Sequence, residues 1–92
     1  MKERDIEAHA REAIERAGGR MFKWVSPGHR GVPDDIVFWP GGHVHLIELK
    51  SPGESPDAQQ EYMHKLLRSL GAVVLVFDSI RAVDSYVKKA AG

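Results

Sequence analysis

Two short acidic segments carry the residue types best suited to chemistry. In Gly31-Val32-Pro33-Asp34-Asp35, glycine and proline favour a turn that ends on an acid. In Glu48-Leu49-Lys50, the two-residue period of a strand places the acid and the base on one face and Leu49 on the other. Each segment alone has an ordinary explanation, turn chemistry for the first and a solvated salt bridge at a strand end for the second.

The two segments are more informative as a pair. Residues 34–50 have the pattern of a β-hairpin, with Pro40-Gly41-Gly42 as its turn. Such a hairpin can bring Asp34 beside Glu48, where the two carboxylates repel each other unless a cation lies between them. Oxygen ligands of this kind suit Mg²⁺ or Mn²⁺. Asp35 points to the opposite face from Asp34, so we favour Asp34 as the ligand.

The remaining pattern predicts the elements that hold this hairpin in place. The expected order is α-β-β-β-α-β-α, a mixed α/β fold in which helices cover a central sheet. The expected elements are a helix over 4–17 stopped by Gly18-Gly19, a strand over 21–25, strands over 36–39 and 43–50, a helix from Pro56 to Leu70 with Ser55 as N-cap, a strand over 72–77 buried on both faces, and a short terminal helix carrying Ile80, Val83 and Val87. The second helix carries an apolar stripe expected to face the sheet, made of Met63, Leu66, Leu67 and Leu70.

Composition excludes several other classes of protein. The 92 residues predict one domain, and the absence of cysteine excludes disulfide frameworks and thiolate metal sites. With 13 basic and 13 acidic residues, the chain has no bulk positive charge with which to coat nucleic acid. The longest apolar run, over 72–77, is far too short to span a membrane, and the N-terminus has no apolar signal core. We therefore expect a soluble intracellular domain.

Flanking residues make the pattern more specific. Pro33-Asp34 followed by Glu48-Leu49-Lys50 matches the signature of the PD-(D/E)XK nucleases. From Glu3 to Ile80 the chain also resembles the VRR-NUC family (virus-type replication-repair nucleases), in its stand-alone phage or bacterial form. The matching positions are Glu3, Asp5-Ile6-Glu7, Gly18-Gly19, Lys23, Gly31-Val32-Pro33-Asp34, Glu48-Leu49-Lys50, Gln60, Leu67 and Gly71. The resemblance implies a single nuclease domain over 1–92 with a PD-(D/E)XK-like mixed sheet flanked by helices.

The resemblance also implies roles for the central residues. Asp34 and Glu48 correspond to the metal ligands, together with the backbone carbonyl of Leu49. Lys50 would orient the attacking water or stabilise charge on the phosphate. A bound Mg²⁺ or Mn²⁺ would acidify a water and polarise the phosphoryl oxygen. No organic cofactor is implied.

Glu7 corresponds to the acid of the family's first helix, expected to be catalytic and to reach the metal through a water. It shares a helical face with Ala10 and Ile14, so it borders the apolar side. The alternative is an ordinary surface pair with Arg11. Glu3, one turn earlier, is the weaker candidate.

Gln60 corresponds to the family's catalytic glutamine by its spacing to Leu67 and Gly71. Helical geometry alone would favour Gln59, which lies nearer the centre of the apolar stripe. We follow the register of the resemblance and expect Gln60 at the site. The alternative for both residues is the helix surface.

Lys23, His29 and Arg30 form a basic cluster just before the acidic turn. Such a cluster can neutralise DNA phosphates without reading sequence, although ordinary surface charge is an equal alternative. His43 and His45 share a strand face but lack a third ligand, so a zinc site is disfavoured.

Two tryptophans, Trp24 and Trp39, could stack on bases, but we expect them to pack in the core or at an interface.

The resemblance implies a metal-dependent endonuclease that hydrolyses DNA phosphodiester bonds. It also implies selectivity for branched DNA, as in a four-way-junction resolvase, in phage or bacterial replication, recombination or repair. The expected location is the cytoplasm of a bacterial or phage-infected cell. The alternatives are a non-catalytic nucleic-acid-binding or assembly module on the same fold, and a structural dimerisation domain. Retention of Asp34, Glu48 and Lys50 favours the enzyme.

A homodimer is expected for three reasons. A chain this short covers its own core poorly. Apolar residues Ile80, Val83 and Val87, with Trp39-Pro40 at the hairpin tip, offer candidate contacts. The stand-alone viral members that the chain resembles are similar to dimeric junction resolvases.

Overall fold

The computed structural model describes all 92 residues, and it contains a four-stranded mixed sheet between two layers of helices. In chain order the elements are α1 (Glu3–Arg16), β1 (Arg20–Lys23), β2 (Asp35–Trp39), β3 (His43–Leu49), α2 (Ala58–Ser69), β4 (Val73–Phe77) and α3 (Ile80–Ala91). This confirms the predicted order and fold class. None of the three helices is both long and apolar enough to cross a membrane.

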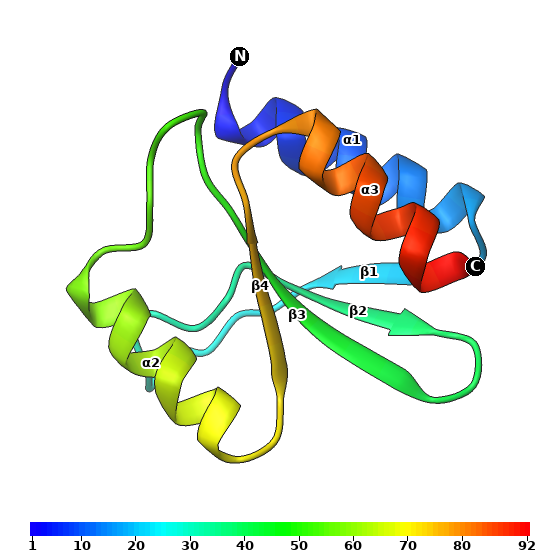
Figure 1. Ribbon diagram of the computed structural model, residues 1–92. Coiled ribbons are helices and arrows are strands. Elements are labelled where there is room, and N and C mark those ends of the chain that lie inside the picture. Colours follow the sequence, from blue (N-terminus) through cyan, green and yellow to red (C-terminus); the bar gives the residue numbers. More distant parts are fainter.

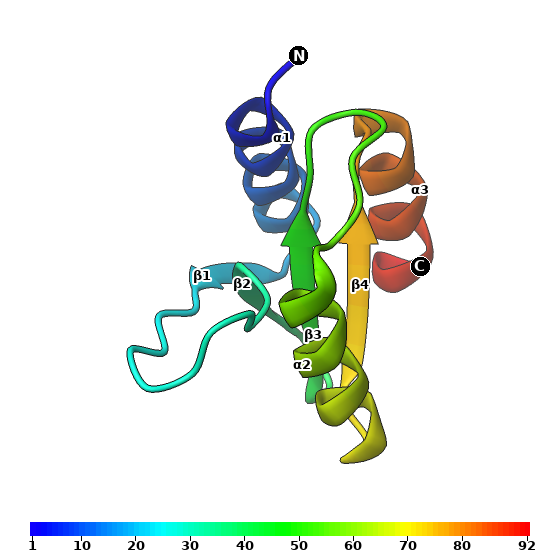
Figure 2. The same cartoon turned by 90° about the vertical axis from the view of Figure 1, so that its left-hand side faces the viewer.

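The sheet has the strand order β1-β2-β3-β4, with β1, β2 and β3 antiparallel and β4 parallel to β3. Helices α1 and α3 lie side by side on one face, and α2 lies on the other (Figures 1 and 2). Figure 2 shows α2 in front of β3 and β4 only. The part of this face formed by β1 and β2 therefore has no helix over it.

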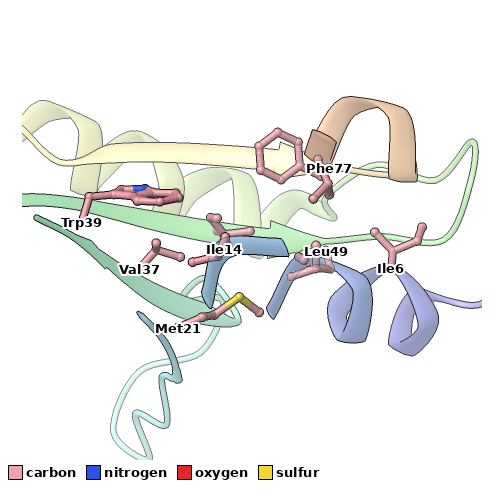
Figure 3. Packing of buried hydrophobic residues seen from close by; sticks show 10 residues of the cluster. Ile6, Ile14, Met21, Val37, Trp39, Leu49 and Phe77 are labelled. Atoms are coloured by element: carbon pink, nitrogen blue, oxygen red, sulfur yellow. The ribbon is translucent and has the colours of Figure 1, made fainter. Parts of the chain in front are cut away.

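The main core fills the space between the sheet and the α1/α3 layer (Figure 3). Its members are Ile6, Ala10, Ile14, Met21, Val37, Trp39, Ile47, Leu49, Phe77 and Val83. The Trp39 indole donates a hydrogen bond of 2.8 Å to the Tyr86 hydroxyl, which ties β2 to α3. Val83 is fully buried and Val87 packs against the cluster. Our expectation that Val83 and Trp39 would form a subunit contact is therefore wrong, because the core within one chain already covers them, whereas Val87 is only partly buried.

The hairpin forms as predicted, with its turn at residues 40–42. Gly41 and Gly42 adopt φ values of +92° and +86°, which residues with a side chain rarely adopt. In the resulting register Asp35 pairs with Ile47 and so faces α1 and α3. Asp34, one residue earlier, lies toward the α2 face.

The start of α2 differs from the prediction. The N-cap is Asp57, whose carboxylate accepts a hydrogen bond of 2.9 Å from the Gln60 amide. The Gln60 side-chain oxygen in turn accepts one of 3.0 Å from the Asp57 amide. The predicted N-cap Ser55 and the first-turn Pro56 lie before the helix. This reciprocal capping box satisfies two backbone donors, which a lone serine cap does not do.

The face of α2 that packs on the sheet also differs. Met63 and His64 are buried, whereas Leu66 is 42% exposed and Leu70 is 77% exposed. The apolar stripe is therefore only partly used for packing, and the expectation that all four of its residues face the sheet is wrong.

Candidate active site

The start of β2, the end of β3 and the first two turns of α2 meet on one face of the sheet. Asp34 directly precedes β2, and its carboxylate accepts a hydrogen bond of 2.9 Å from the Leu49 amide. Alternation along β3 points Leu49 into the core and Glu48 toward α2. The structure therefore brings the predicted pair, Asp34 and Glu48, to the same side.

Glu48 is the most constrained side chain of this site. It is 1% exposed, and its Oε2 accepts a hydrogen bond of 3.1 Å from the Gln60 amide nitrogen. The Lys50 ammonium lies 3.7 Å from the same oxygen. Burial and, after it, the neighbouring charge of Asp34 raise the pKa of Glu48 to about 8, although the charge of Lys50 acts in the opposite direction. The pair Glu48–Lys50 is thus buried and is no solvated strand-end salt bridge.

Gln60 is the glutamine that reaches the site, and Gln59 is exposed. The capping box with Asp57 fixes the rotation of this first turn. The acidic turn packs directly against the same turn of α2, because a Cβ on Gly31 would lie only 2.7 Å from the Gln59 carbonyl oxygen. The absence of a side chain at Gly31 therefore allows the acidic turn to pack against the turn of α2 that carries Gln60.

Glu7 takes part in a second charged cluster, on the α1 face of the sheet. Its carboxylate accepts a hydrogen bond of 2.6 Å from Lys23, and hydrogen bonding with Asp35 lowers the pKa of Glu7. Asp35 is fully buried with Arg11 at 3.5 Å, and burial followed by the hydrogen bond to Glu7 raises its pKa to about 8. The structure places Glu7 beside Lys23 and Asp35, and it places Asp35 away from Glu48.

Glu3, the weaker first-helix candidate from the sequence, also responds to the charges of the predicted site. Its pKa is raised by burial and then by the charge of Asp34, and it is lowered by the charge of Lys50. The charges of Asp34 and Lys50 therefore act on Glu3 as well as on Glu48. The position of Glu3 one turn before Glu7 was the available signal.

The predicted basic cluster is divided in the structure. Lys23 is paired with Glu7, whereas His29 and Arg30 are exposed in the connection between β1 and β2. This connection projects away from the sheet in Figure 2. His29 and Arg30 are therefore the members of the cluster that are open to a ligand.

The predicted ligand set fits a small divalent cation. Glu48 Oε1 is buried without a hydrogen-bond partner, and it lies beside a second carboxylate, Asp34. A cation there would satisfy the orphaned oxygen and relieve the repulsion between the two acids. No group of three or more His, Cys, Asp or Glu side chains is arranged to hold a metal ion. The predicted set accordingly consists of two carboxylates and the Leu49 carbonyl.

Nothing in the sequence pattern singles out His64, yet it lies at the site. Its Nε2 atom is buried 3.6 Å from Glu48 Oε1. The available signal was its spacing of four residues from Gln60, which places both side chains on one side of α2. His45, by contrast, lies on the other face of the sheet, where its Nδ1 atom and the Tyr86 hydroxyl share a hydrogen bond of 2.6 Å.

A hairpin that carries Asp and Glu-x-Lys on the α2 face of a mixed sheet defines an α/β protein of the PD-(D/E)XK nuclease class. A solved structure described as "VRR_NUC domain" superposes with a TM-score of 0.88 and 32% identity, over 96% of each chain. A protein of Acyrthosiphon pisum secondary endosymbiont phage 1, described as "Putative nuclease p44", is 43% identical over 79 residues, 86% of this chain and 85% of the relative. No protein-family model matches the chain. The chain belongs to the VRR-NUC family of nucleases.

Proposed function

We propose that this protein is a divalent-metal-dependent endonuclease that hydrolyses phosphodiester bonds in DNA. The observation that carries the proposal is the buried Glu48 carboxylate, with one unpartnered oxygen, Asp34 beside it and Lys50 at 3.7 Å. Burying the Glu48 carboxylate beside a second acid is unfavourable unless a cation neutralises the pair. The description of the phage relative as a nuclease supports the same activity.

Each residue of the site has a role that its position supports. Asp34, Glu48 and the Leu49 carbonyl would hold Mg²⁺ or Mn²⁺, which when bound acidifies a water and polarises the phosphate. Lys50 would orient the attacking water and stabilise the charge that develops on the phosphate. Gln60 would hold Glu48 in place through its hydrogen bond.

The first-helix acids complete the proposed site. We propose that Glu7 acts through a water, because its carboxylate is paired with Lys23. Glu3 is the competing candidate, since the charge of Asp34 raises its pKa. Comparing the cleavage rates of Glu3→Gln and Glu7→Gln separates the two candidates, because only the substitution of the acid that contributes to the site should lower the rate.

The DNA contacts are proposed to come from the connection between β1 and β2. His29 and Arg30 are exposed there, and Lys23 lies at its start. These cations would contact phosphates without reading sequence. We further propose a homodimer acting on branched DNA such as a four-way junction, in phage or bacterial replication, recombination or repair in the cytoplasm. The phage origin of the similar nuclease supports this setting.

A cleavage panel tests the proposal. Single-stranded, duplex, flap and four-way-junction DNA are incubated with the protein and Mg²⁺, Mn²⁺, Ca²⁺ or excess EDTA. We expect cleavage with Mg²⁺ or Mn²⁺, strongest on the junction, binding with little cutting in Ca²⁺, and none in EDTA. Asp34→Asn and Glu48→Gln should abolish cutting, whereas Asp84→Asn, an exposed acid on α3, should not.

Two results would contradict the proposal. Full activity in excess EDTA would exclude the metal-dependent mechanism. Tight DNA binding without cutting in any metal would favour the non-catalytic module instead.

A further inference from the structure

Helix α2 buries a histidine while it leaves two leucines in solvent. Of its 12 residues only Met63 and His64 are buried, whereas Leu66 and Leu70 are 42% and 77% exposed. Apolar burial alone would rotate the helix so that the leucines face the sheet. Burying an imidazole with an unpartnered nitrogen costs free energy instead. Something other than apolar packing therefore accounts for the side of α2 that faces the sheet.

The contacts of Glu48 identify what the helix supports. Its Oε2 accepts the 3.1 Å hydrogen bond from Gln60, and its Oε1 lies 3.6 Å from His64 Nε2. Glu48 Oε1 and His64 Nε2 are both buried, and neither has a hydrogen-bond partner. Each oxygen of the carboxylate thus faces one side chain of α2, and the two side chains are four residues apart on the helix.

We infer that His64 is a positioning residue that works with Gln60 to fix the orientation of the Glu48 carboxylate toward the divalent cation. The inference rests on the proposed metal-dependent function. A distance of 3.6 Å exceeds a normal hydrogen bond by about half an ångström, so a small rotation of the ring would close it. Oε1 of an ionised carboxylate has two lone pairs, so it can accept from His64 and still bind the cation. Groups that orient a metal ligand commonly change metal affinity by about 10–100-fold when they are replaced.

A neutral imidazole suits this role. Burial lowers the pKa of His64, and the charges of Arg68 and Lys50 lower it further. A neutral ring can donate to Glu48 without cancelling the negative charge that attracts the cation. Lys50 already supplies the positive charge on this side of the carboxylate.

The test measures Mn²⁺ binding to the full chain without DNA, by titration calorimetry, together with cleavage. His64→Leu fills the space of the ring with an apolar side chain and removes the nitrogen that faces Glu48. We therefore expect Mn²⁺ affinity to fall about 10–100-fold and the cleavage rate to fall with it. His64→Gln keeps an N–H donor of similar reach and should retain most of the affinity. The melting temperature of metal-free His64→Leu should match or exceed that of the wild type, because an unpartnered buried nitrogen is lost.

His45→Leu is the matched control, because His45 is bonded to Tyr86 on the opposite face of the sheet. It should leave Mn²⁺ affinity unchanged. If His64→Leu misfolds, His64→Asn serves in its place, since the shorter side chain withdraws from Glu48 and should weaken Mn²⁺ binding. Wild-type Mn²⁺ affinity in folded His64→Leu, or in folded His64→Asn, would overturn the positioning role while leaving the proposed function intact. A wild-type protein that neither binds Mn²⁺ nor cuts DNA would overturn both.

Discussion

At the scale of single residues, Lys50 carries the clearest prediction about rate. Its ammonium is largely buried beside Glu48, so it is preorganised to face charge that develops on a phosphate. Removing such a charge typically lowers the rate by about 10²–10³. Lys50→Ala should therefore lose most cleavage but keep its fold and much of its DNA binding, as measured by single-turnover kinetics and circular dichroism. Lys65→Ala, an exposed lysine on α2, is the control. Cleavage by Lys50→Ala at the wild-type rate would show that Lys50 only forms an ion pair with Glu48 and has no catalytic role.

Glu48 predicts how stability depends on pH. Its pKa is raised from the ordinary 4.5 to about 8 in the folded, metal-free protein. The folded state therefore keeps a proton that the unfolded chain releases, so stability falls as pH rises from about 4.5 to about 8. Glu48→Gln removes this contribution. In EDTA, its melting temperature should fall less between acidic and mildly alkaline pH than that of the wild type. Asp35, whose pKa is also raised, contributes a slope to both proteins. Parallel pH profiles would contradict the prediction.

The central acids were predictable because strand alternation and a tight turn determine their relative positions. Asp34 and Glu48 are separated by one hairpin, and a hairpin register allows few arrangements. The relative contributions of Glu3 and Glu7 were not predictable. Which turn of α1 approaches the site depends on how the whole helix lies across the sheet, and helical periodicity carries no information on that. His64 was not predicted because the leucine stripe favoured another face of α2, although its spacing of four residues from Gln60 places both side chains on one side of the helix.

At the scale of elements, the acidic turn is positioned by a glycine. Gly31 has a φ of +82°, and a Cβ there would meet the backbone of Gln59 at 2.7 Å. Gly31→Ala should therefore push the turn away from α2, lowering both the melting temperature and the cleavage rate. The atoms that this Cβ would meet belong to the backbone of α2, which cannot move aside as the end of a long side chain can.

Gly28 provides the matched control for this prediction. It lies in the same connection, and a Cβ there would meet nothing within 4 Å. Gly28→Ala should leave melting temperature and cleavage near wild-type values. Equal behaviour of the two variants would show that the close approach at Gly31 does not position the site.

Helix α2 shows where reasoning about elements from sequence fails. The existence of this helix, and its end just before Gly71, were predictable from the sequence pattern. Its first residue was not, because Asp57 competes with Ser55 as a cap and gains a reciprocal bond with Gln60. Its rotation was not predictable either. The leucine stripe favoured one face, and the polar contacts of Gln60 and His64 with Glu48 favour another.

At the scale of the whole molecule, the layers were predictable but the open surface was not. The sequence pattern assigns helices to the sheet without saying how many strands each covers. Helix α2 lies over β3 and β4 only. Apolar side chains on β1 and β2, and one near the start of β3, stay exposed. Phe22, Phe38 and Val44 are between 44% and 49% exposed, and the two phenylalanine rings meet edge to face with centroids 6.0 Å apart. The register places all three on the face that carries α2 and Glu48.

This open sheet face is where we expect a second copy of the chain to pack, in place of the α3 surface that the sequence suggested. Exposed aromatic and branched side chains gathered on neighbouring strands favour association, and twofold dimers are the commonest soluble assembly. Phe38→Ser should convert a dimer at micromolar concentration into a monomer, measured by light scattering. Tyr62→Ser removes an aromatic ring that is 68% exposed on α2 and should leave the dimer intact.

Because the open face adjoins Asp34, a dimer formed there would hold two Asp34/Glu48/Lys50 sites near one DNA molecule. Phe38→Ser should therefore nick single strands of a junction but lose paired cuts. A wild-type chain that is monomeric, or a Phe38→Ser variant that still cuts both strands together, would contradict this assembly.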